Sequence, residues 1–297
     1  MNNFSACSKC KCLRPISNHL YELARLGELL NNSNEFISEE RSRVVSTYDL
    51  SQWLKLAAQL VSVKVDAWKF SGVDGLWCRP AADMYDSDSK HYSNFCFHLN
   101  RFIYTYNALE EVYKFLDGHY SDIPKKVRSH SIKFAILLDN SEELLIPENF
   151  WHLSENFQNI VGRYHSAFQR KIDSEMMFNG KASYALDLIR NIRNHIAHGV
   201  FPIVENPDYD IFDGKMSLVV KLLGHSCRLA ALYIQIAFMN FNHGFEGDIN
   251  LFVDTLDDSM VEPFLIKHLH NAHLISDFGL NPNEFAEWEM NKLGEID

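Results

Sequence analysis

Apolar residues recur at helical spacing through most of this 297-residue chain, and no convincing series of alternating apolar and polar residues indicates strands. The spacing is clearest before residue 200, where six apolar side chains three or four positions apart form one stripe. This stripe consists of Ala182, Ala185, Leu186, Ile189, Ile192 and Ile196. Hydrophobic residues make up 46% of the chain, which is ample for a core. We therefore expect an all-α protein.

The same spacing predicts where the helices begin and end. We expect them at residues 18–30, 49–70, 91–116, 125–138, 148–171, 182–198 and 218–240. Glycines, a proline and an acidic stretch between residues 72 and 89 predict a loop that separates two parts of the chain. The predicted organisation is an N-terminal helical extension over residues 1–80, a helical bundle over residues 91–243 and an acidic C-terminal extension over residues 244–297.

The helix expected at residues 182–198 ends in a segment that carries arginine, asparagine and histidine. Arg193 begins an Arg-Asn-x-x-x-His pattern that ends at His198, and Arg190 begins a second one that ends at His195. A guanidinium grips phosphate oxygens at two points, and histidine exchanges a proton near neutral pH. These residue types together point to cleavage of RNA.

The segment resembles the HEPN superfamily, whose members share a helical bundle and a loose Arg-x-x-x-x-His signature, often followed by glycine. The resemblance covers about residues 91–243, and the best match runs from Arg193 to Gly199, because the family commonly ends its motif in Ala-His-Gly. It implies a metal-independent endoribonuclease that needs no cofactor and works as a homodimer, with one motif from each subunit facing across the interface. It also implies a toxin or antiviral defence effector, with an antitoxin or regulatory protein as a further partner.

The resemblance gives each motif residue a role. An RNA 2′-hydroxyl attacks the adjacent phosphate, which yields a 2′,3′-cyclic phosphate and a 5′-hydroxyl. His198 acts as general base or acid, Arg193 stabilises charge on the phosphoryl oxygens and Asn194 orients one of them. The candidate supporting residues are Arg190, His195 and Glu110.

Helix geometry adds an expectation about Arg193. At 100° per residue Arg193 lies nearly in line with Leu186 on the apolar stripe, so its guanidinium should point toward protein, whereas Arg190 lies on the polar flank. Five residues of helix leave Arg193 and His198 about 140° apart around the axis. Either the helix ends between them, with Gly199 as its C-cap, or a second subunit completes the site.

Other interpretations of the motif remain open. Arg193 could instead form a buried ion pair with Glu110 or Glu111, while His198 caps a helix end, which would leave a noncatalytic module that binds or scaffolds a partner protein. A nucleotidyl-transferring or nucleotide-sensing assembly is a third reading, although the chain has no glycine-rich phosphate loop.

The formal net charge of −11 is concentrated at one end of the chain. Residues 243–297 contain 12 acidic residues and two lysines, so the first 242 residues are nearly neutral. Two basic runs in this neutral part could contact RNA phosphates, or could be solvated helix faces. The candidate RNA-binding residues are Lys125, Lys126, Arg128, Arg170 and Lys171. The acidic extension could restrain the site by mimicking nucleic acid, or simply be a solvated surface.

The chain shows no evident signal peptide, and its longest apolar helical stretch, residues 229–241, is shorter than the roughly 20 residues needed to span a bilayer. We therefore expect a cytoplasmic protein that does not bind membranes. Cys7, Cys10 and Cys12 could form a zinc site with His19, but their spacing departs from paired Cys-x-x-Cys motifs. We expect no bound metal.

Overall fold

The computed structural model describes residues 15–33, 46–70, 77–144, 146–147, 150–164, 181–201, 203, 206 and 215–241. Within these residues the regular elements are helices and no strand is present, so the protein is all-α as predicted. The α-helices are α1 (Ile16–Ser33), α2 (Tyr48–Gln59), α4 (Arg79–Phe115), α5 (His130–Asn140), α6 (Phe150–Tyr164), α8 (Tyr184–Ala197) and α9 (Lys215–Phe241). The short 3-10 helices are η1 (Ala67–Phe70) and η2 (Leu116–Tyr120).

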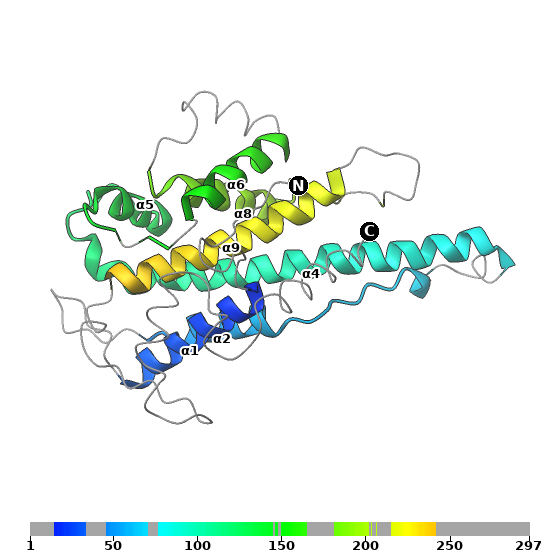
Figure 1. Ribbon diagram of the computed structural model, residues 1–297, viewed down its shortest axis with the longest axis horizontal. Helices are drawn as coiled ribbons and strands as arrows, with labels where there is room; N and C mark the ends of the chain where they lie inside the picture. The colour runs from blue at the N-terminus through cyan, green and yellow to red at the C-terminus, as the bar shows by residue number, and fades with distance from the viewer. Residues whose placement is uncertain are drawn as a thin grey trace.

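Two long helices, α4 and α9, pack against each other through the middle of the molecule (Figure 1). The α1–α2 pair lies on one side of them, and α5, α6 and α8 lie on the other (Figure 1). Helix α9 contacts α1, α4, α6 and α8, and α4 contacts α2 and α5, so the other helices are arranged around these two. None of the helices in the described ranges is long and apolar enough to cross a membrane.

Buried side chains from these α-helices form one hydrophobic core. Each of the seven contributes at least one side chain with no solvent exposure: Leu23, Leu54, Phe102, Phe134, Phe157, Ile189 and Ile236. Helices on both sides of residue 80 therefore share this core. The division of the chain into three parts stays a prediction, and residues 244–297 lie outside the described ranges.

The prediction of a helix over residues 49–70 is wrong in its second half. Helix α2 ends at Gln59, and residues 60–66 are extended and run beside α4 (Figure 1). Valine alternates with polar residues there, and β-branched side chains favour extended backbone over helix. Side chains of α4 hold this segment: Arg101 donates to the Leu60 carbonyl at 2.9 Å, and the Val65 N–H donates to Ser93 Oγ at 2.8 Å.

The loop predicted between residues 72 and 89 is also wrong where the structure describes it, because α4 begins at Arg79 and includes the whole acidic stretch. Pro80 lies in the first turn, where its missing N–H has no helical partner to lose. The acidic residues also have partners: the Trp68 indole N–H donates to Asp86 Oδ1 at 2.7 Å. Tertiary contacts of this kind are not visible in local composition.

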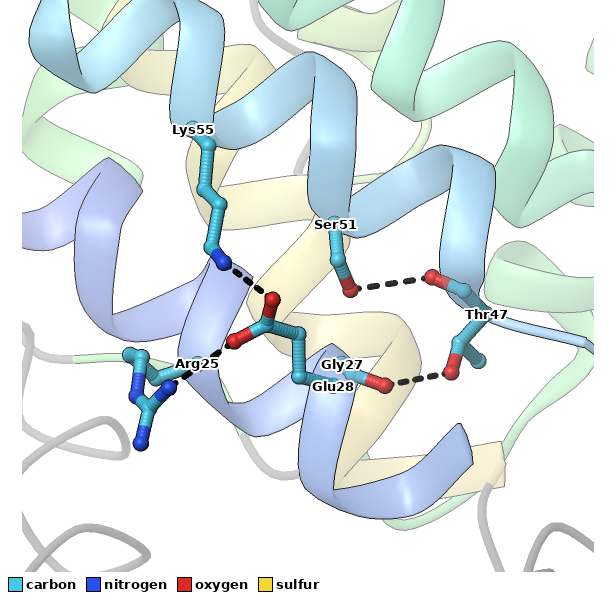
Figure 2. A network of polar contacts seen from close by, with 6 residues as sticks. All are labelled: Arg25, Gly27, Glu28, Thr47, Ser51 and Lys55. Carbon is cyan, nitrogen blue, oxygen red and sulfur yellow. Dashed lines mark hydrogen bonds and ion pairs between the residues drawn. The ribbon is translucent and has the colours of Figure 1, made fainter. Parts of the chain in front are cut away.

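Helices α1 and α2 approach closely at Gly27 (Figure 2). A Cβ atom on Gly27 would lie 2.5 Å from Ser51 Oγ, so only glycine fits this crossing without a shift. The Thr47 hydroxyl donates to the Gly27 carbonyl, and Ser51 Oγ donates to the Thr47 carbonyl at 2.9 Å. An ion pair between Glu28 and Lys55 closes the same contact (Figure 2).

A buried polar network joins α1 to α9. His19 is 1% exposed; its Nε2 lies 2.8 Å from Gln235 Oε1, and its Nδ1 lies 3.1 Å from Arg228 Nη1. Because a guanidinium only donates, Nδ1 accepts and Nε2–H donates to Gln235. Both ring nitrogens are therefore engaged inside the protein, which removes His19 from the zinc site considered above. Outside the described residues lie Cys7, Cys10 and Cys12.

Candidate active site

The helix that carries the motif, α8, is held at its start by side chains from two other helices. The Ser183 N–H and hydroxyl both donate to the Asp139 carboxylate at the end of α5, at 3.2 and 2.8 Å. The Tyr233 hydroxyl of α9 accepts the Leu186 N–H at 2.8 Å and donates to the Ala182 carbonyl at 2.6 Å. Orphan N–H groups of the first helical turn thus find partners, which fixes the start of α8.

The apolar stripe of α8 faces the core, as its spacing predicted. Leu186, Ile189 and Ile192 are at most 1% exposed, and α8 contacts α5, α6 and α9. Burial of this stripe sets the rotation of the helix about its axis. It therefore also sets the direction in which each polar residue of the motif points.

Arg193 lies against α4, in agreement with its place on the stripe. Its Nη2 is 3.2 Å from Glu110 Oε1, and its guanidinium carbon is 5.6 Å from the centre of the Tyr106 ring. The two side chains of the pair are 37% and 41% exposed, so this is a surface ion pair rather than the buried one considered above. Such surface pairs stabilise a protein by only about 0–1 kcal/mol. Glu110 therefore positions the Arg193 guanidinium but leaves it able to bind another anion.

Tyr106 adds a buried aromatic ring to this cluster. Burial, and to a smaller extent Glu110, raises the pKa of Tyr106 to about 12, while Arg193 acts in the opposite direction. The phenol is therefore protonated at neutral pH and can donate a hydrogen bond. Tyr106 and Glu110 are four residues apart, one turn of α4, and both contact Arg193.

Arg190 is paired within its own helix. Its Nη2 contacts Asp187 Oδ1, and the Asn191 amide donates to Asp187 Oδ2 at 3.2 Å. This arrangement fits the expectation that Arg190 lies on the polar flank of α8, one turn before Arg193.

His195 belongs to the packed side of the helix. It is half-buried, with its ring centre 6.4 Å from that of Tyr164. Its carbonyl accepts the N–H groups of Val200 and Phe201, at 2.9 and 3.0 Å. These contacts give His195 a packing role at this helix end, and its role as a supporting residue stays a prediction.

The C-terminal end of α8 is a Schellman motif built on Gly199. Helix α8 ends at Ala197 with His198 as its C-cap. Gly199 has φ 67°, its N–H donates to the Ile196 carbonyl at 3.1 Å, and the Val200 N–H donates to the His195 carbonyl at 2.9 Å. The motif fixes the backbone of His198 while leaving its imidazole exposed to solvent.

The end of the helix does not bring Arg193 and His198 together. The His198 N–H still donates to the Asn194 carbonyl at 2.9 Å, so His198 keeps its helical position around the axis. Helix α8 does end between the two residues, at Ala197, but this end leaves His198 at its helical angle from Arg193. Asn194 is half-buried between the two. Completion of the site by a second subunit stays a prediction.

The candidate RNA-binding residues are only partly within the described ranges. Lys125, Lys126 and Arg128 are exposed in the segment between η2 and α5. Arg170 and Lys171 lie outside the described residues. Among the residues that the structure places, no group of three or more His, Cys, Asp or Glu side chains could hold a metal ion.

Sequence reasoning missed Tyr106, Asp139 and Tyr233. Tyr106 reads as one of many aromatic core positions in its helix, and the signal that could have found it is its spacing of one turn from Glu110. Asp139 and Tyr233 reach α8 from other helices, so local sequence carries no sign of their contacts.

Comparisons with known proteins add no relative. No model of a known protein family matches the chain, and neither the curated proteins nor the solved structures contain a match.

Proposed function

We propose that the protein is an endoribonuclease that acts as a homodimer without a metal ion or cofactor. The observation that carries the proposal is the arrangement on α8: a half-exposed Arg193, steadied by Glu110 and Tyr106, on the same helix end as an exposed His198. These are the side chains that phosphate binding and proton transfer require. The resemblance to the HEPN superfamily supports the same reaction and suggests a toxin or antiviral role.

The arrangement in one chain favours a dimer. Arg193 and His198 point to different sides of α8, so one subunit alone does not present both to one phosphate. In a two-fold dimer Arg193 of one subunit can meet His198 of the other. Apolar side chains next to the motif support an interface there, since Val200 and Ile203 are 55% and 69% exposed.

The chemistry needs no further reactant. His198 takes the proton of the 2′-hydroxyl, whose oxygen attacks phosphorus, and the P–O5′ bond breaks. His198 then gives this proton to the leaving O5′, so one Arg193 and one His198, from different subunits, complete the reaction. Arg193 exchanges its weak contact with Glu110 for the phosphoryl oxygens, where it stabilises the charge of the transition state. The products are a 2′,3′-cyclic phosphate and a 5′-hydroxyl.

The test is cleavage of mixed structured RNAs by the purified protein in excess EDTA. We expect His198→Ala to lower kcat by about 10²–10⁴-fold and Arg193→Ala by about 10²–10³-fold. Arg79→Ala, which removes an exposed arginine at the start of α4, is the matched control and should cleave as the unmodified protein does. DNA of the same sequence lacks the 2′-hydroxyl and should survive. Unchanged cleavage by both motif variants would refute the assignment.

A second function is favoured by one observation. The Arg193–Glu110 ion pair joins α8 to α4 within one chain, as a purely structural pair would. A noncatalytic module that binds a partner protein accounts for this pair without any reaction. In that case folded, dimeric protein leaves every RNA intact, and Arg193→Ala affects stability alone.

A further inference from the structure

A groove of about 570 Å³ lies between α5 and α8, beside the candidate site. Its walls include the apolar residues Ile132, Ala135 and Leu186, the hydroxyl-bearing Ser131 and Ser183, and Tyr184. Its charged residues are Asp139, Lys181, Asp187 and Arg190. The proposed reaction uses none of these residues.

The groove follows α5 and the first two turns of α8. Ser183, at the start of α8, binds Asp139 at the end of α5, and the lining residues continue back along α5 to Ser131 and forward along α8 to Arg190. One end therefore lies at Lys181 and the other at Arg190. Arg193 follows Arg190 by three residues, about 4.5 Å along the axis. The Arg190 end of the groove thus leads directly to the proposed phosphate position.

The two carboxylates in the groove already have partners. Asp139 accepts two bonds from Ser183, and Asp187 is shared by Arg190 and Asn191. Arg190 offsets the charge of Asp187, whereas Asp139 is bound by two neutral donors, and each carboxylate still has lone pairs that can accept from an N–H group. A groove with apolar walls, hydroxyls and a carboxylate acceptor suits the faces and edges of an unstacked base.

The cations at the two ends suit the phosphates on either side of such a base. Lys181 lies at one end and Arg190 at the other. Lys125, Lys126 and Arg128 precede α5, whose first turn lines the Arg190 end. Cationic side chains therefore continue from the Arg190 end of the groove onto the exposed surface, a pattern typical of a path for a single nucleic-acid strand.

We propose that the α5–α8 groove binds the base of the RNA nucleotide next to the scissile phosphate, with Lys181 and Arg190 on its flanking phosphates. This inference rests on the proposed function, because it takes Arg193 as the residue that holds the scissile phosphate. The groove is then the place where the enzyme selects a single-stranded nucleotide.

The test separates RNA binding from RNA cleavage. All binding variants are made in His198→Ala protein, and the dissociation constant of a short labelled single-stranded RNA is measured by fluorescence anisotropy at several salt concentrations. Ala135→Phe fills the groove without changing charge, and Lys181→Ala removes one cation. The control is Lys90→Ala, which removes an exposed lysine near the start of α4. Thermal unfolding checks that each variant is folded.

We expect Ala135→Phe to weaken binding about tenfold with an unchanged salt dependence, because it displaces a base rather than a phosphate contact. Lys181→Ala should weaken binding and reduce the slope of log Kd against log salt by about 0.7, the value for one lost phosphate contact on a single strand. Lys90→Ala should change neither quantity.

Equal RNA affinity in all these variants, or no RNA binding at all, would overturn the groove proposal. Binding of a free nucleoside monophosphate in the groove without competition from RNA would also overturn it, and would assign the groove to a small ligand. For cleavage, Ala135→Phe and Lys181→Ala are also made in protein that keeps His198. If both cleave RNA with an unchanged KM, the groove proposal is wrong but the ribonuclease proposal is not. If the groove variants weaken RNA binding but the unmodified protein does not cleave RNA, the proposed reaction is wrong and the groove proposal is not.

Discussion

Replacement of Gly199 by alanine tests the claim that the end of α8 is held by backbone conformation. Gly199 has φ 67°, and a Cβ atom placed there meets no atom within 4 Å. Steric overlap therefore does not destabilise the variant. The loss of stability comes from placing an L-residue in the left-handed region, which costs about 1–2 kcal/mol. Alanine also reduces the freedom of the unfolded chain, which offsets part of that cost. We expect Gly199→Ala to lower the free energy of unfolding by about 1 kcal/mol.

Gly224 provides a matched control with the opposite sign. It lies in the interior of α9, and its Cβ likewise meets nothing within 4 Å. Its backbone is helical, so Gly224→Ala should raise the free energy of unfolding by about 0.5–1 kcal/mol. Urea unfolding followed by circular dichroism measures both variants, with an unchanged m-value as evidence that only stability differs. If both substitutions shift stability in the same direction, the Schellman account of this helix end is wrong.

Three further perturbations test the packing around the site. Tyr233→Phe leaves the Leu186 N–H and the Ala182 carbonyl without their buried partner and should cost about 1–3 kcal/mol in urea unfolding, whereas Tyr48→Phe, at an exposed tyrosine, should change stability by less than about 0.5 kcal/mol. Gly27→Ala should cost about 1–3 kcal/mol by overlap with Ser51 Oγ, and Ser51→Ala in the same chain should recover part of that loss. Burial, and to a smaller extent Arg101, lowers the pKa of His98 to about 4, whereas the unfolded chain titrates near 6.5. The unfolded state then binds more protons, so the stability of the protein should fall as pH falls from about 6.5 to about 4. The midpoint temperature of thermal unfolding should fall less for His98→Gln than for the unmodified protein over that pH range. An equal fall in both proteins would contradict this.

Periodicity located most helices because each buries a continuous stripe of its own side chains. The expected helices over residues 18–30 and 218–240 correspond closely to α1 and α9, and the stripe through Ile189 also gave the direction of Arg193. The second helix failed where valines favour extended backbone and α4 side chains bind it. The predicted loop failed because α4 continues through acidic residues whose partners come from another segment.

The candidate site was partly predictable for the same reason. The direction of Arg193 follows from its own helix, and Glu110 was a candidate because it lies on a neighbouring helix of the bundle. Tyr106 and the α5–α8 groove depend on how the helices cross, and local spacing does not specify a crossing angle. Arg193 and His198 remain apart in one chain because α8 keeps its helical bond to the His198 N–H, so their meeting depends on a second copy of the protein.

The most direct test of the central claim is cleavage by a mixture of Arg193→Ala and His198→Ala subunits. Each variant carries a different tag, so that mixed dimers can be purified and counted, and cleavage is measured in EDTA. If Arg193 of one subunit works with His198 of the other, each mixed dimer has one intact site. Random pairing then restores about a quarter of the activity of the unmodified protein, although either variant alone is inactive. Mixed dimers as inactive as the separate variants, under conditions where the unmodified protein cleaves, would contradict a site shared between subunits.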